Sequence, residues 1–186
     1  MEPNKEYIDD VFQDIIDHIT EIYDPVIAGT PATGGVLPYS LSGSLKSIAR
    51  ELIARENKMI RNFPLIALVH DIDENKGKSL ANQYVISPRI LILEESKKDY
   101  FPSERITNTF KSVLIPLYNL LLNELADNPN INIGIVDLIA HKKTNRLDWG
   151  TQQANDKLNA FLDGIDIQFT DLKIFKEIVE TTIFTK

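Results

Sequence analysis

The chain has 186 residues, of which 43% are hydrophobic and 25% charged, so it can bury a core and is neither a disordered tail nor a membrane protein. Its 20 Lys and Arg residues against 27 Asp and Glu residues give a formal charge of -7, which argues against a dedicated nucleic-acid binder because such proteins carry a basic stripe. The absence of cysteine excludes a disulfide framework, a thiolate zinc site and a thiol nucleophile. No apolar run is long enough to cross a membrane and the acidic N-terminus is not signal-like, so we expect a soluble chain.

The first predicted element is an amphipathic helix from Lys5 to Ile22. Acidic and polar residues lie opposite one apolar arc of about 120°, which is formed by Ile8, Val11, Phe12, Ile15, Ile16, Ile19 and Ile22. We expect this helix to cover a sheet.

The segment from Tyr23 to Ser44 contains repeated prolines and glycines and shows no clear period. A connection of this length without regular structure is uncommon inside a compact domain, so the segment is predicted to be an extended arm or loop. A short amphipathic helix then begins at Leu45 and ends in the polar run Arg55 to Lys58.

Two strands are predicted next. Phe63 to Val69 is apolar on both alternating faces, which indicates a central strand with Pro64 at its start. After the acidic turn Asp71 to Gly77, a second strand runs from about Tyr84 to Glu94 and is interrupted by Pro88.

The longest predicted helix runs from Ser103 to Ala126. Pro116 removes one backbone hydrogen bond, so a kink is expected there. Ile115 and Leu122 point away from the apolar stripe of the first half of the helix. Because burying each of them is worth about 1.5–3 kcal/mol, we expect them to meet a second surface, either another element of this chain or another copy of it.

The C-terminal part is predicted to hold a third strand from Ile131 to Ile139, a polar loop from His141 to Gly150, a weak helix from Asn155 to Asp163 and a last strand from Ile165 to Ile174. A phase slip in the last strand indicates a bulge near Thr170 and Asp171. The whole chain, residues 1–186, is then one α+β domain: a single sheet of about four strands with helices packed on one face, the long arm 23–44 and the C-terminal tail 177–186.

A search for chemistry yields no catalytic residue, no metal site and no cofactor motif. The three histidines have no partner at ligand spacing, and no phosphate-binding loop or nucleophile turn is present. A metal-dependent hydrolase that uses His70, Asp71 and Asp73 is the enzyme alternative. Asp148 is interpreted as a loop anchor rather than a catalytic acid.

Arg146 and Trp149 lie together in the predicted polar loop, and Trp149 is the only tryptophan. One interpretation is that Trp149 folds back into the core of its own subunit. The other is that both residues anchor an interface, because Trp and Arg dominate binding hot spots. The candidate interface residues are therefore Ile115, Leu122, Arg146 and Trp149.

Several local patterns occur together: Phe63 to Leu68 before an acidic turn, Ile90 to Leu93, Tyr100 to Arg105, His141 to Lys143 leading to Arg146 to Gly150, and Asp163 to Ile167. In these patterns and in its order of elements the chain resembles phage tail-completion and tail-terminator proteins. The versions in phages of Bacteroidetes hosts, including neck ring proteins of crAss-like phages, are the most similar. The likeness covers Lys5 to Ile22 and Asn62 to Lys176, while the arm and the tail depart from it.

The resemblance implies a tail-terminator-like fold and a non-enzymatic virion protein without a cofactor, found in the host cytoplasm during assembly and then in the neck or tail of the particle. It implies a closed ring of about six or twelve copies that joins portal or adaptor proteins to tail proteins, with genomic DNA passing through without specific binding. A domain of this size is about 40 Å across, so about six copies leave an opening of about 35 Å. A head-to-tail stopper on a different tier of the neck and a soluble protein-binding adaptor module are the alternatives.

Overall fold

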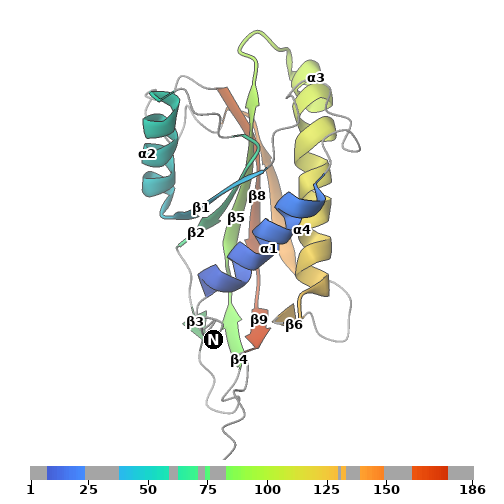
Figure 1. Ribbon diagram of the computed structural model, residues 1–186. Helices are drawn as coiled ribbons and strands as arrows, with labels where there is room; N and C mark the ends of the chain where they lie inside the picture. The colour runs from blue at the N-terminus through green and yellow to red at the C-terminus, as the bar shows by residue number, and fades with distance from the viewer. Residues whose placement is uncertain are drawn as a thin grey trace, which may run out of the picture.

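A five-stranded mixed sheet lies at the centre of the computed structural model (Figure 1). The structure describes residues 8–23, 38–58, 63–70, 74–75, 83–129, 131–132, 139–148 and 161–175. The strand order is β1-β2-β5-β8-β7; β1 is parallel to β2, and the other neighbouring pairs are antiparallel. The bounds are β1 Tyr39–Gly43, β2 Leu65–Val69, β5 Arg89–Ser96, β7 His141–Arg146 and β8 Phe161–Phe169.

A second, smaller sheet continues from the middle of the first. Its order is β3-β4-β9-β6, with bounds β3 Glu74–Asn75, β4 Gln83–Ile86, β6 Ile131–Asn132 and β9 Leu172–Phe175. The predicted interruption at Pro88 is confirmed, because it separates β4 from β5. The bulge predicted near Thr170 and Asp171 is instead a break between β8 and β9, which belong to different sheets, and Asp171 has a left-handed φ of 53°.

The helices lie on both faces of the main sheet, which corrects the prediction of helices on one face only. Helix α1 (Ile8–Ile22) and the long helix pack on one face, whereas α2 (Leu45–Glu56) packs on the other (Figure 1). The physical reason lies in β2, which is buried along its whole length and needs cover on both sides. The α+β class itself is confirmed, and the prediction of about four strands is roughly compatible with the five of the main sheet. The prediction of a single sheet is wrong, because the chain bends after β8 and before β5 and the segments beyond form a second sheet.

Each face has its own hydrophobic core. The α1-side core joins α1 and the long helix to alternate strand residues, among them Phe12, Ile15, Ile19, Leu117, Leu121, Ile66, Leu68, Ile90, Ile92, Ile165 and Ile167. The α2-side core joins α2 to the intervening strand residues, whose side chains point to the opposite face. Its members are Ile48, Leu52, Phe63, Leu65, Ala67, Val69, Leu91, Leu93 and Leu162. This alternation fixes which face every strand residue occupies.

The long helix consists of α3 (Pro102–Arg105), a π-helical segment η1 (Ile106–Leu114) and α4 (Ile115–Asp127). The backbone N–H of Ile115 donates to the carbonyl of Phe110, five residues back. This wider turn immediately precedes Pro116, whose ring would crowd the carbonyl four residues back in a regular α-helix. The π-helical segment therefore lets the helix continue through the proline.

Several predicted segments differ from the structure, among them Glu74–Asn75, which was expected within a turn and forms β3. Tyr39–Gly43, expected within the arm, forms β1, and His141–Arg146, expected as a loop, forms β7. Residues 161–163, expected to end a weak helix, begin β8. Both β1 and β7 are edge strands. Edge strands often carry polar or charged side chains, which discourage pairing with other chains, so they need not show an alternating apolar pattern. Of the predicted third strand, Ile131 and Asn132 form β6; residues 133–138, 24–37 and 177–186 lie outside the described residues.

Candidate functional site

The main sheet ends in two strands of different chemistry. Among the described strands, β1 pairs only with β2, and β7 pairs only with β8. β1 is uncharged, whereas β7 carries one histidine, two lysines and one arginine in six residues. An edge strand offers backbone N–H and C=O groups to a further strand. These two edges and the surfaces beside them form the candidate functional site.

Arg146 of β7 is held by a buried carboxylate on β8. Its Nε donates to Oδ2 of Asp166 at 2.7 Å, and Arg89 binds the same carboxylate through Nε at 2.8 Å and Nη2 at 2.7 Å. Burial alone would raise the pKa of Asp166, but the hydrogen bonds from Arg89 and Arg146 outweigh it and hold that pKa below its ordinary value. The three residues lie on the α2 side of the sheet and fix β7 against β8.

The other face of β7 contacts α4. His141 Nε2 lies 2.6 Å from the hydroxyl of Tyr118, and Nδ1 lies 2.6 Å from the carbonyl oxygen of Ile139. The ammonium group of Lys143 lies over the Tyr118 ring, 4.0 Å from its centroid. Burial lowers the pKa of Lys143. Lys142 and Lys143 are both exposed, so β7 presents positive charge on both faces of its edge.

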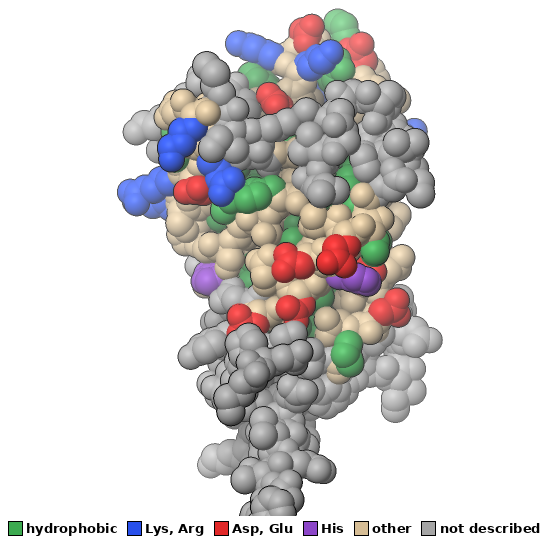
Figure 2. Space-filling model, viewed as in Figure 1, with side chains coloured by type: hydrophobic (Ala, Val, Ile, Leu, Met, Phe, Trp, Pro, Cys, Tyr) green, Lys and Arg blue, Asp and Glu red, His purple; other side chains and the backbone are tan. Residues whose placement is uncertain are grey.

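The outer surface of α1 is acidic. Asp10, Asp14, Asp17 and Glu21 lie away from the core, and His18 Nδ1 contacts Oε2 of Glu124 at 2.5 Å. Figure 2 shows acidic side chains gathered over α1, while Lys and Arg side chains gather over α2. Charge is therefore separated between different surfaces of the subunit.

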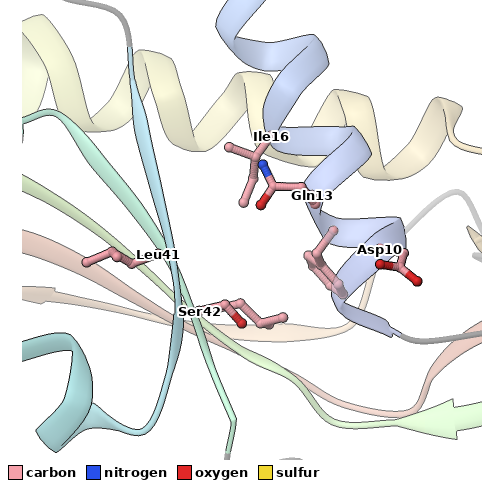
Figure 3. Close-up of a pocket in the computed structure, with 7 residues that line it drawn as sticks. Asp10, Gln13, Ile16, Leu41 and Ser42 are labelled. Carbon is pink, nitrogen blue, oxygen red and sulfur yellow. The ribbon is translucent and has the colours of Figure 1, made fainter. Parts of the chain in front are cut away.

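A pocket of about 170 Å³ opens between α1 and β1 (Figure 3). It is lined by Asp10, Phe12, Gln13, Ile16, Leu41, Ser42 and Leu68. On this side of β1 the sheet presents serines, Ser40 and Ser42, and Gln13 Nε2 donates to Ser40 Oγ at 3.3 Å. The lining combines an apolar floor with a polar rim. Such a lining suits a side chain with an apolar stem and a charged end.

Ser42 also contacts His70 beside this pocket, through Oγ and Nε2. The sequence alone gives no sign of this pair, because Ser42 on β1 and His70, directly after the parallel neighbouring strand β2, lie 28 positions apart. After Ser42 the chain turns sharply at Gly43, where an added Cβ would lie 2.6 Å from the hydroxyl of Ser47, and Ser44 caps α2. A serine beside histidine Nε2 is the contact used by serine nucleophiles, but both side chains are exposed to water here.

An ion-pair cluster around the buried Arg105 lies at the C-terminal end of β7. Arg105 Nη2 lies 2.6 Å from Asp163 on β8 and 2.6 Å from Asp148, which has a left-handed φ of 54°. Burial alone would lower the pKa of Arg105, but hydrogen bonds to Asp148 and Asp163 raise it. The interpretation of Asp148 as a loop anchor agrees with these contacts, whereas Arg105 was missed because nothing in its local sequence marks it as buried.

The structure does not bring the candidate interface residues together. Ile115 and Leu122 lie on α4, are half-buried and pack against the α1-side core, so the surface they meet includes this chain's own core. Arg146 lies on the opposite face of the sheet, at the β7 edge. Trp149 lies outside the described residues.

No protein-family model matches this chain, and no curated protein matches its sequence. Across the described ranges, no group of three or more His, Cys, Asp or Glu side chains is arranged to hold a metal ion. The enzyme alternative includes Asp71 and Asp73, which lie outside those ranges. Within the same part of the chain, no helix has the length and apolar character needed to span a membrane.

Proposed function

We propose that this protein is a virion structural protein of a tailed phage: a head–tail connector subunit of tail-terminator-like fold. It forms a ring, joins portal or adaptor to tail around the DNA channel, and catalyses no reaction. The observation that carries the proposal is the pair of unlike edges, β1 and β7, at opposite ends of one sheet. When opposite ends of a subunit bind each other, the contacts are heterologous, and heterologous contacts form closed rings if the rotation between copies fits.

The charge distribution supports a head-to-tail contact. The acidic surface of α1 flanks β1, while β7 at the far edge is basic. Two copies that meet through the same surface would oppose like charges, whereas copies that meet through different surfaces oppose unlike charges. The overall charge of -7 also suits a channel, because a negative protein repels phosphate and lets DNA slide past.

The proposal is tested by the size of the purified protein in solution, measured by light scattering, and by imaging the neck of the virion. We expect a closed ring of about six or twelve copies in both. A subunit that remains monomeric in the assembled particle would contradict the proposal.

The Trp149→Ala variant separates the two interpretations of this residue. We expect it to impair ring assembly more than it lowers the melting temperature of the subunit, because tryptophan side chains are frequent interface anchors. An equal loss of assembly and of subunit stability would favour packing in the subunit's own core.

A soluble adaptor module, or a stopper on a different tier, is the second candidate function. The observation that favours it is the exposed apolar surface at the start of the long helix, where Phe101 is 72% exposed and Ile106 48% exposed. Limited proteolysis distinguishes the two functions: cleavage of the segment 23–44 in the final assembly would favour loose binding over a locked ring.

A further inference from the structure

From the topology we infer that neighbouring subunits join by adding β7 of one copy to β1 of the next, antiparallel, so that the sheet continues from copy to copy. This inference rests on the proposed function and specifies the surfaces through which subunits of the ring bind each other. Along the order β1-β2-β5-β8-β7 the strand directions are up, up, down, up and down. A second copy placed beside β1 in the same orientation therefore brings its β7 alongside in the antiparallel direction, the more stable pairing.

The two faces of the sheet restrict the register to one choice. Directly opposed residues on neighbouring strands share a face. Ser40 and Ser42 of β1 lie on the α1 side, as do His141, Lys143 and Asn145 of β7. Only one register pairs all five residues of β1 with β7 and also matches the faces. It sets Lys143 opposite Ser42 and Asn145 opposite Ser40.

On the α1 side of the sheet, this register brings unlike charges of the two edges together. Lys143 of the incoming copy faces the pocket between α1 and β1, whose lining includes Asp10, Phe12 and Leu68. A lysine fits such a pocket because its methylene stem packs on apolar side chains while its ammonium group meets a carboxylate. In the isolated subunit the same ammonium group lies over the ring of Tyr118, so binding exchanges one cation contact for another.

Disulfide cross-linking tests the strand pairing directly, because the natural chain has no cysteine. In the Ser40→Cys/Asn145→Cys variant, oxidation should give a ladder of covalent oligomers on a denaturing gel. Ser40→Cys/Thr144→Cys is the matched control, since Thr144 lies on the other face, and it should give no ladder. Suppose that light scattering shows the ring of the natural chain. The strand pairing is then wrong if the first variant gives no ladder or if both variants give the same ladder, while the proposed function stands. If no ring is seen at all, the proposed function itself fails.

A charge exchange tests the role of Lys143. Lys143→Asp should raise the protein concentration needed for ring formation by about tenfold or more, which corresponds to about 1.4 kcal/mol per contact. Adding Asp10→Lys to the same chain should restore assembly, because each head-to-tail contact then regains one charge of each sign. Arg50→Asp on α2 is the control and should assemble normally. Loss of assembly with Arg50→Asp but not with Lys143→Asp would place the contact on α2 and overturn the inference.

Discussion

Replacement of Arg105 should destabilise the subunit strongly. The Arg105 side chain is 9% exposed, and its Nη2 lies 2.6 Å from the carboxylate of Asp163, whose side chain is fully buried. Glu94 lies opposite Asp163 on β5 and is also buried. The Arg105→Met variant keeps an apolar stem but leaves the Asp163 carboxylate without its buried cation. Removing one partner of a buried ion pair costs about 3–5 kcal/mol, because the remaining charge is stranded away from water.

For a chain of this length, that loss corresponds to a fall in melting temperature of about 6–20 °C. Thermal unfolding followed by circular dichroism measures it. The control is Arg55→Met, because Arg55 pairs with Glu51 at 2.8 Å on α2, where the two side chains are 25% and 47% exposed and the ion pair is reached by water. Such surface pairs are worth less than about 1 kcal/mol.

The double variant Arg105→Met/Asp163→Leu completes the thermodynamic cycle. It should recover most of the lost stability, since well-packed apolar residues can replace a buried ion pair at little cost. Asp148, the other partner of Arg105, is 39% exposed and can be solvated by water. If Arg105→Met melts at the same temperature as Arg55→Met, the buried pair does not stabilise the fold and the reasoning is refuted.

Three further predictions concern acid stability, the core and reactivity. Because flanking arginines hold the pKa of Asp166 below its ordinary value of 3.8, its charge stabilises the fold above that pH and the stabilisation is lost as the pH falls below it. Asp166→Asn should therefore be less stable at pH 7 in denaturant titrations and lose less stability on acidification; parallel curves would contradict this. Leu117→Ala should lower the free energy of unfolding by about 2–5 kcal/mol, because Leu117 is fully buried. Ile106→Ala, at an exposed site, should lower it by about 0.5 kcal/mol or less. Equal urea midpoints for the two variants would refute the assigned burial. A fluorophosphonate probe should not label Ser42, and labelling that disappears in His70→Ala would reveal an activated serine.

Periodicity predicted the elements that face the core. The helices α1, α2 and α3–α4 and the strands β2 and β5 were found because a buried face leaves a regular pattern of large apolar side chains in the sequence. The same pattern did not show that α2 lies on the opposite face from α1. That outcome depends on β2, whose two faces are both apolar and so give no preference for where each helix packs.

The buried ion pairs could not be predicted from local patterns. Arg105 and Asp163 lie 58 positions apart, and Arg89 and Asp166 lie 77 positions apart. Each charged residue is acceptable only because the fold brings its partner to it, since an isolated buried charge is too costly to persist. A single sequence shows both charged residues of such a pair but does not show that they lie close together in the fold.

Two of the strands that periodicity missed, β1 and β7, are those on which the proposed contact between copies depends. An edge strand that pairs only after assembly must stay soluble as a free subunit, so it is selected for serines and lysines rather than for apolar alternation. The polar and basic residues of β7 make its sequence look like a loop. The same residues would keep this edge soluble until another subunit binds it. The Lys143 charge, which discourages non-specific pairing with another β7, becomes favourable beside an acidic surface, and the acidic surface of α1 lies next to β1 on the same face of the sheet. A chain with both features favours head-to-tail pairing over self-pairing of either edge.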